Sequence, residues 1–218
     1  MAGNAQNSKE YKKDSTYIYK DYIIFEGDTI VIELAEVQVL KKLKFQESYD
    51  RRYYYWFRNK TFNAYPYAKL AAERLIVLNE RLDKIKSKRK RKEYTKIVQK
   101  YLEGEFTDQL KKLTRTEGRI LIKLLHRQTG ATAFDLIKEV RSGWKAFWYN
   151  NTASLFKLSL KDEYDPENVY EDFLIEDILQ RAFIDGKLER QPSKLEFDYL
   201  EIAAKMGDKI HIPEELKK

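Results

Sequence analysis

Residues 114–143 decide the fold and read TRTEGRILIKLLHRQTGATAFDLIKEVRSG. Apolar side chains recur at helical spacing on both sides of a polar corner at residues 126–130. Thr114 or Thr116 can cap the first helix, and Gly130 can end it because glycine readily adopts the left-handed conformation of helix C-termini. Thr132 then opens the next helix. The stretch therefore predicts two short helices that meet at a corner.

The same periodicity extends beyond this stretch in both directions. Pro66 lies within a long helical pattern and should kink or split it near residues 64–65. Asp165 and Pro166 together form a strong helix start, since Asp caps and Pro suits the first position, and Gly186 provides the stop. The expected helices cover residues 47–84, 90–106, 144–158, 165–184 and 199–206.

A β element precedes the helices. Two β-branched and aromatic runs, residues 22–25 and 29–34, flank the short turn 26–28 and predict a β-hairpin. The predicted fold class is therefore mainly α, a multi-helix domain with a small N-terminal β-hairpin. The expected organisation is a disordered N-terminus at 1–16, a β-hairpin element at 17–45, a helical domain at 46–186 and a C-terminal tail with a short helix at 187–218.

The composition narrows the class of protein. The chain has 218 residues, of which 43% are hydrophobic and 35% charged, with 8 Gly and 4 Pro. These values favour one helical domain over a disordered chain or many short strands. Cysteine is absent, which excludes disulfides, Cys-ligated zinc and thiol catalysis. No apolar run approaches the ~20 residues that span a bilayer.

The start of the chain suggests secretion. Gly3-Asn4-Ala5 has the small-x-Ala form of a signal-peptidase site, after which Gln6 would begin the mature chain. We therefore expect residues 1–5 to be the remnant of a signal peptide and the protein to be periplasmic. A cytoplasmic protein with an ordinary disordered start is the alternative.

Several segments together resemble an uncharacterised domain-of-unknown-function family of cell-envelope proteins in the Bacteroidota. The resemblance implies a secreted, mostly helical, periplasmic protein, and it supplies no catalytic residues and no established activity. The segments that carry it are 65–71, 113–114, 118–124, 126–130, 144–148 and 164–166.

The corner at 126–130 is the first candidate site. His126 lies in the last turn of its helix, where the helix dipole favours a protonated side chain, and Arg127 offers a fork for a carboxylate or phosphate. Thr129 adds a hydroxyl, while Arg119 lies too far along the helix to join the corner directly. These residues could bind an anionic group, but a lone histidine without a spaced second ligand is more often structural.

Two other features bear on partners. The aromatic runs 53–57 and 144–149 contain more rings than one helix face can bury, so some rings should meet a partner. The net charge is +7. The segment at residues 84–92 is basic and the stretch 161–180 is acidic, so the two could face each other in the fold. The aromatic candidates are Trp56, Tyr65, Tyr67, Trp144 and Trp148, and the basic patch is Lys86, Lys88, Arg89, Lys90 and Arg91.

The carboxylates at 171, 172, 176 and 177 could in principle act as a catalytic pair, but nothing isolates one acid in an apolar pocket, and a solvated acidic face is favoured. No metal site, cofactor or catalytic residue is predicted. We expect a non-catalytic interaction or assembly-accessory protein that binds an envelope protein complex. The alternatives are a binder of, or enzyme on, a cell-wall polymer centred on His126 and Arg127, and a nucleic-acid binder using residues 84–92, which we disfavour.

Overall fold

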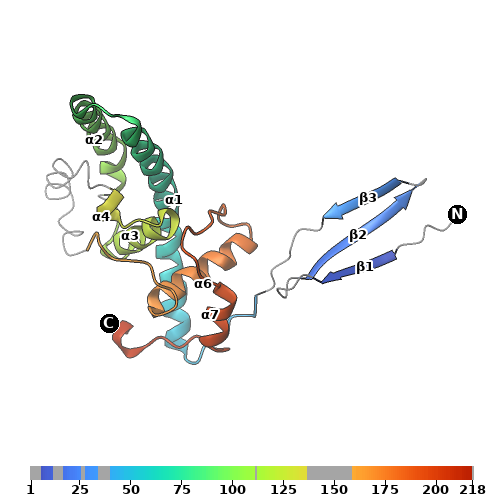
Figure 1. Cartoon of the computed structure of the whole chain (residues 1–218). Helices are drawn as coiled ribbons and strands as arrows, with labels where there is room; N and C mark the ends of the chain where they lie inside the picture. The colour runs from blue at the N-terminus through green and yellow to red at the C-terminus, as the bar shows by residue number, and fades with distance from the viewer. Residues whose placement is uncertain are drawn as a thin grey trace. The chain divides into compact units, whose positions relative to one another are not determined.

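The computed structural model describes residues 6–11, 17–25, 28–33, 40–110, 112–136 and 159–217. They belong to two compact units, Met1–Leu40 and Lys41–Lys218 (Figure 1). The helix expected at 144–158, with Trp144 and Trp148, lies outside the described residues.

The first unit is a three-stranded antiparallel sheet with the strand order β1-β2-β3. Strand β2 is central, and its register pairs Tyr22 with Val31 of β3. Strand β1 lies within the segment 1–16 that we expected to be disordered. Whether this β element is a stable part of the fold stays a prediction. The strands are β1 Gln6–Tyr11, β2 Tyr17–Phe25 and β3 Asp28–Glu33.

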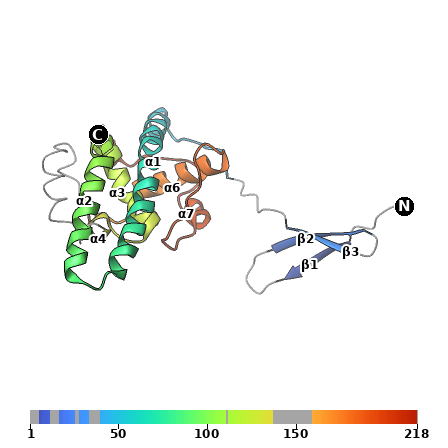
Figure 2. The same cartoon turned by 90° about the horizontal axis from the view of Figure 1, so that it is seen from above.

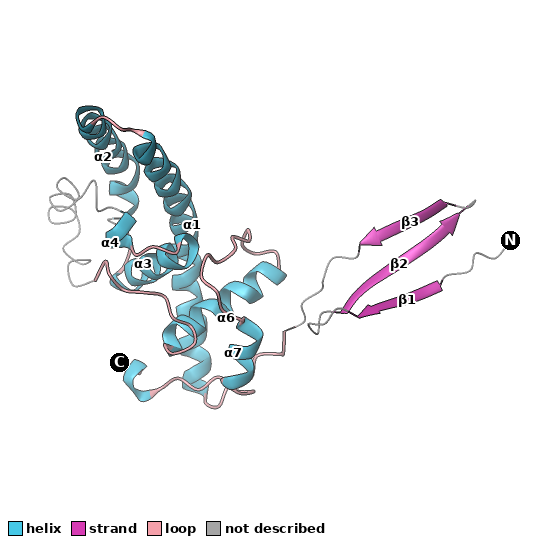
Figure 3. Ribbon diagram, viewed as in Figure 1, coloured by secondary structure: helices cyan, strands magenta, loops and turns pink. Residues whose placement is uncertain are grey.

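The second unit is helical, which confirms the predicted mainly α class (Figure 3). Helices α1 and α2 fold back on each other, and α3 packs along α1 (Figures 1 and 2). The described helices are α1 Ser48–Lys84, α2 Lys88–Leu110, α3 Arg115–Thr129, α4 Ala133–Leu136, α6 Tyr170–Ile184 and α7 Tyr199–Lys205, followed by a 3-10 turn at Glu214–Leu216.

Helix α3 is the centre of the helical unit. Its N-terminus is held by a capping box, in which the Thr114 hydroxyl accepts from the backbone N–H of Glu117 and the Glu117 carboxylate accepts from the backbone N–H of Thr114. Its C-terminus ends at Gly130, whose φ of 72° is left-handed. The cap and the stop expected from the sequence are therefore both present. The apolar residues between them are buried: Ile120, Leu121, Ile122, Leu124 and Leu125.

We expected Pro66 to kink or split this helix; α1 runs unbroken from Ser48 to Lys84, so it is not split. Proline removes the N–H that would bond the carbonyl four residues earlier. Pro66 lies on the exposed side of the helix, where water can satisfy that carbonyl. The buried side chains of α1, among them Phe57 and Ala68, hold both halves in one helix.

Helix α6 begins later than the sequence suggested. Asp165 accepts a hydrogen bond from the Asn168 backbone, but residues 166–168 form a separate turn, and the helix starts at Tyr170. The expected cap is real but closes a turn, and Val169 occupies the helix N-cap. The expected end of the helix near Ile184 agrees with the structure.

The chain after α6 packs back on the helices. Ile210 forms a parallel bridge with Phe45, just before α1. The Tyr199 hydroxyl lies 2.6 Å from Asp177 of α6, and Ile202 and Ile212 are buried. The segment 187–217 thus contributes side chains to the core of the helical unit.

Candidate functional site

A row of ion pairs joins α3 to α6. It includes three cationic side chains from the stretch 114–143 with which the sequence analysis began. Arg119, Lys123 and Arg127 are spaced four residues apart, so they lie on one face of α3. They meet three carboxylates of α6 in order: Glu171, Asp172 and Glu176. We call this row the α3–α6 ladder. It corrects the expectation of a solvated acidic face, because Asp172, Glu176 and Asp177 are all buried.

The innermost pair of the ladder is Arg127 with Glu176. The guanidinium donates two hydrogen bonds to the carboxylate, at 2.7 and 2.9 Å, and a third to the Gln191 carbonyl at 3.1 Å. Glu176 also accepts from Tyr164 and Gln180, so both of its oxygens are filled. Burial alone would raise the pKa of Glu176, but Arg127 outweighs it and the pKa lies below its usual range. Arg127 is 1% exposed, and an external anion cannot reach it in this structure.

His126 lies beside this pair but points its Nδ1 atom elsewhere. That nitrogen accepts a hydrogen bond of 2.8 Å from the Tyr164 backbone N–H, so it carries no proton. Desolvation lowers the pKa of His126, and the carboxylate of Glu163 opposes this only in part. The helix dipole was expected to favour the protonated form, and here burial and the backbone donor have the larger effect.

The middle pair of the ladder is incomplete. The Lys123 ammonium lies 2.8 Å from Asp172 Oδ2, which also accepts from the Asp165 backbone N–H. Asp172 Oδ1 is buried and has no hydrogen-bond partner among the described residues. Desolvation raises the pKa of Asp172, although Lys123 and the backbone donor lower it. The acid is therefore held less firmly in its charged form than Glu176.

Thr129 of the corner and Arg119, one of the other site candidates, are also engaged within the protein. Thr129 Oγ1 donates to the Leu125 carbonyl one turn earlier, at 2.7 Å, and accepts from the Ala131 backbone N–H. Arg119 donates to Glu171 at 3.1 and 2.6 Å on the partly exposed end of the ladder. The structure thus brings Arg119 into one row with Arg127 but closes that row with protein carboxylates.

Lys123 and Tyr164 were not among the site candidates from the sequence, and Glu176 was considered only as one carboxylate of a solvated acidic face. A signal for them exists, because basic side chains every fourth residue in an otherwise apolar helix require buried acidic partners. The acidic residues at 172 and 176 share a face and meet that requirement.

The aromatic candidates divide between core and surface. Tyr65 is buried, and its hydroxyl donates to the Glu189 carbonyl at 2.7 Å, whereas Tyr67 is half-buried. Trp56 is 45% exposed and lies 5.4 Å from the Tyr53 ring, which stacks on Tyr49 at 6.3 Å. We call Tyr49, Tyr53 and Trp56 the aromatic surface.

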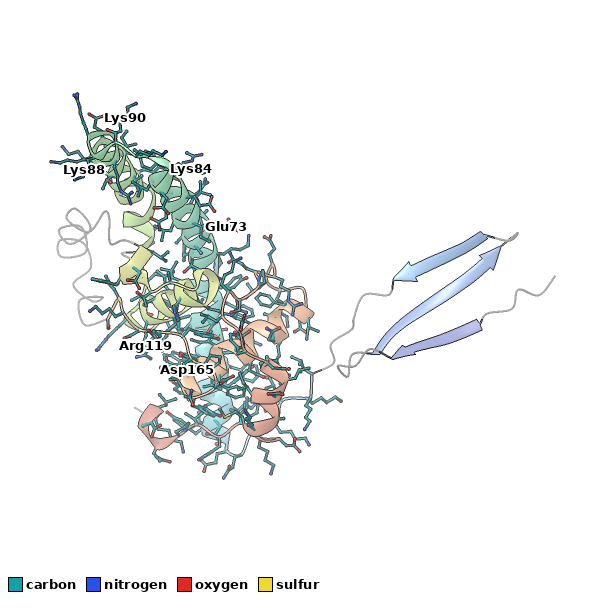
Figure 4. The ribbon with its side chains drawn as sticks, viewed as in Figure 1. Glu73, Lys84, Lys88, Lys90, Arg119 and Asp165 are labelled. Carbon is teal, nitrogen blue, oxygen red and sulfur yellow. The ribbon has the colours of Figure 1, made fainter. Side chains whose placement is uncertain are left out.

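The basic patch lies at the tip of the α1–α2 hairpin. Lys86, Lys88, Arg89 and Lys90 are exposed, and Arg91 is half-buried, 3.6 Å from Asp83. Figure 4 shows Lys84, Lys88 and Lys90 at this tip, away from Arg119 and Asp165. The acidic helix α6 therefore pairs with α3, and the patch remains open to solvent.

Metal sites and membrane-spanning helices are the two other features to consider in the described residues. Within residues 40–110, 112–136 and 159–217, no His, Asp and Glu side chains gather in a group of three that could hold a metal ion. In the same part of the chain, no helix has the length and apolar character needed to cross a membrane.

Comparison with known proteins identifies one family. The family model described as Domain of unknown function (DUF4294) matches residues 28–181. All the segments that carried the resemblance lie within this range. No curated protein and no solved structure matches the chain.

Proposed function

The chain belongs to the DUF4294 family, and we propose that it is a non-catalytic interaction or assembly-accessory protein that binds a protein partner through the aromatic surface. The observation that carries the proposal is Trp56, which exposes 45% of its area although most other rings of its run are wholly or partly buried. Exposed Trp side chains are enriched at the energetic centres of protein interfaces.

The surroundings of Trp56 fit such a centre. Tyr54 and Phe57, on the neighbouring positions of α1, are buried and fix this part of the helix against the core. Tyr53 contacts both Trp56 and Phe57, so the exposed rings are backed by packed ones. Rings held in this way lose little conformational entropy on binding. Burial raises the pKa of Tyr53 to about 12, so its hydroxyl stays neutral at an interface.

Cationic side chains border the same rings. The Arg52 guanidinium lies 6.0 Å from the centre of the Tyr49 ring, and the Lys217 ammonium lies 5.6 Å from it. Tyr, Trp and Arg together are the residue types that dominate protein–protein hot spots. The composition therefore favours a protein partner over a small molecule.

The N-terminal β element provides a second contact in this proposal. Strands β1 and β3 are the two edges of the sheet, and each pairs with β2 on one side. An edge strand offers unpaired backbone groups to which an extended segment of a partner can add. Sheet completion would also stabilise a three-stranded element, which is small for independent stability.

The proposed location is the periplasm of a member of the Bacteroidota. The support is the resemblance to an envelope family and the Gly3-Asn4-Ala5 segment. Fractionation of the source cells, with N-terminal sequencing of the recovered protein, tests this part separately. Recovery in the periplasm with Gln6 as the first residue would support it, and recovery in the cytoplasm would refute it.

The test of the function is a crosslinked pull-down of the tagged full-length protein from its source cells. We compare the wild type with Trp56→Ala and with the matched control Ile184→Ala, because Ile184 is also 45% exposed but lies at the end of α6. One partner complex should be recovered in fixed ratio, and Trp56→Ala should weaken it by about 30-fold, the effect of a ~2 kcal/mol hot spot.

Thermal unfolding of both variants must match the wild type, so that loss of binding reflects the surface alone. Equal recovery of the partner with Trp56→Ala, or equal loss with Ile184→Ala, would contradict the proposal. Recovery of the protein alone would favour the cell-wall alternative, against which the internal pairing of Arg127 with Glu176 argues.

A further inference from the structure

A groove of about 410 Å³ lies between the second half of α1 and the first half of α2. The two helices run side by side here (Figure 2). From α1 it is lined by Glu73, Arg74, Val77, Leu78 and Arg81. Arg74, Val77, Leu78 and Arg81 are spaced three, one and three residues apart, so they form one face over two helical turns. The α1 side is thus an apolar centre with an arginine at each end, and the carboxylate of Glu73, next to Arg74, is paired with Lys69 at 2.9 Å.

The α2 side repeats the same spacing with Tyr94, Ile97, Val98 and Tyr101. Val98 is buried and forms the floor, whereas Ile97 is 66% and Tyr101 40% exposed. Val77, across the groove, is 44% exposed. Three large apolar side chains therefore face solvent along one seam, as they do where a further helix packs.

Polar groups in the groove also lack partners. The Tyr94 hydroxyl is buried and makes no hydrogen bond in the described part of the chain. Within that same part, neither Arg74 nor Arg81 has a hydrogen bond or an ion pair, although both are exposed. The Tyr94 hydroxyl is covered by its neighbours, so the two exposed arginines are the groups that a carboxylate of a partner can reach.

The charge around the groove is strongly positive. Residues 73–101 contain eleven Lys or Arg side chains against four Asp or Glu. Lys84, Lys88 and Lys90 stand at the tip of the hairpin above the groove (Figure 4). Such a field attracts an acidic partner and repels a basic one.

From these observations we propose that the α1–α2 groove docks an acidic amphipathic helix of a partner protein, which completes a three-helix bundle. Apolar residues of that helix at positions i, i+3, i+4 and i+7 would cover Val77, Ile97 and Tyr101. Its carboxylates would pair with Arg74 and Arg81.

Two other occupants fit the groove less well. A second copy of this chain would bring its own basic hairpin against the first, and like charges oppose that contact. A nucleic acid would satisfy the arginines but would leave the exposed seam of Val77 and Ile97 in contact with phosphates rather than apolar groups.

The inference goes beyond the proposed function, because it concerns a different surface. Trp56 and Val77 are both on α1 but roughly 30 Å apart along its axis, at 1.5 Å per residue. Binding in the groove can therefore be tested without involving the aromatic surface.

The experiment uses the full chain and a synthetic amphipathic peptide of about 18 residues, with Leu at positions i, i+3, i+4 and i+7 and Glu on its flanks. Fluorescence anisotropy should show saturable binding. Ile97→Ser should weaken it at least tenfold, because it removes an exposed apolar contact. Arg81→Glu should weaken it similarly, and a peptide with Lys in place of the facing Glu should recover most of the loss.

Three matched comparisons make the result decisive. Trp56→Ala and Arg52→Glu should leave the affinity unchanged, since both lie at the far end of α1. A scrambled peptide of the same composition should bind at least tenfold more weakly. The proposal is overturned if the scrambled peptide binds equally, if Arg52→Glu acts like Arg81→Glu, or if no peptide binds. It is overturned equally if sedimentation shows a dimer that Ile97→Ser dissociates, or if only a short duplex DNA binds.

Discussion

At the scale of single residues, the dominant interaction is the buried pair of Arg127 and Glu176. Taking two charges out of water costs several kcal/mol per ion, and mutual attraction compensates only when the geometry is good and the remaining polar atoms are bonded. Here the fork is bidentate and Tyr164 and Gln180 fill the other lone pairs of the carboxylate. The pair is therefore costly to break and fixes how α3 meets α6.

Glu176→Gln should lower the free energy of unfolding by about 3–5 kcal/mol, because it leaves the Arg127 charge buried and uncompensated. The matched control is Glu171→Gln, which removes the partly exposed Arg119 pair and should cost about 0–1 kcal/mol. Urea unfolding of the purified chain measures both. If the two variants lose the same stability, the account of the buried pair is wrong.

A double variant separates charge burial from packing. Arg127→Met with Glu176→Met removes both charges and should be less destabilised than Glu176→Gln alone, since no unpaired charge remains. Greater destabilisation of the double variant would mean that the hydrogen bonds to Tyr164 and Gln191, rather than the charges, dominate.

The residues of the corner could be found from the sequence, but their role could not. A polar, helix-ending corner at His126 and Arg127 is visible as a local pattern. Its closure is not, because Glu176 lies 49 positions away and its approach depends on how α6 packs. The exposure of Trp56 likewise depends on tertiary packing. The run of rings showed that some rings must be exposed, and only the packing of α1 shows which ones.

At the scale of helices, the sequence predicts helix ends best where the backbone geometry requires one residue type. Thr114 and Gly130 bound α3 as expected, because capping and left-handed φ are local properties. Pro66 did not split α1, because the cost of a proline inside a helix depends on whether the freed carbonyl faces water or the core. The start of α6 misled because Asp165 caps a turn as readily as a helix.

Replacing Gly130 at the end of α3 and Gly104 within α2 by alanine should change the stability of the protein in opposite directions. Gly130→Ala should destabilise the protein by about 1–2 kcal/mol, because φ of 72° is unfavourable for an L side chain. The added Cβ meets only an ordinary contact, 3.6 Å from Lys194, so the backbone is the cause. Gly104→Ala, within α2 and with open space around it, should stabilise by roughly 0.5–1 kcal/mol. Thermal unfolding followed by circular dichroism measures both shifts, and shifts of the same sign would contradict this reasoning.

At the scale of the whole helical unit, the segment after α6 belongs to the core. It contributes four buried apolar residues. Tyr199 and Ile202 lie in α7, where a helix was expected, whereas Ile210 and Ile212 lie in a stretch that helical periodicity could not reveal. Burying each such side chain contributes about 1.5–3 kcal/mol. Together they are comparable with the whole stability of a typical domain, about 5–15 kcal/mol.

A chain that ends at residue 186 should therefore lose cooperative unfolding, whereas one that ends at residue 213 should keep it. The longer chain retains all four buried residues and the Tyr199 hydrogen bond to Asp177. Near-UV circular dichroism during heating distinguishes the two, because it reports fixed packing of the rings. A sharp transition in the shorter chain would show that the C-terminal segment is dispensable.

The unbroken course of α1 also sets a distance. Its 37 residues span about 55 Å along the helix, with Trp56 toward one end and the α1–α2 groove toward the other. One continuous helix therefore carries two surfaces at a defined spacing along its length. A binder that reaches both ends would convert its second contact into an intramolecular one and gain avidity without any new interaction. A flexible hinge introduced beside Pro66 would abolish that gain while leaving each individual contact intact.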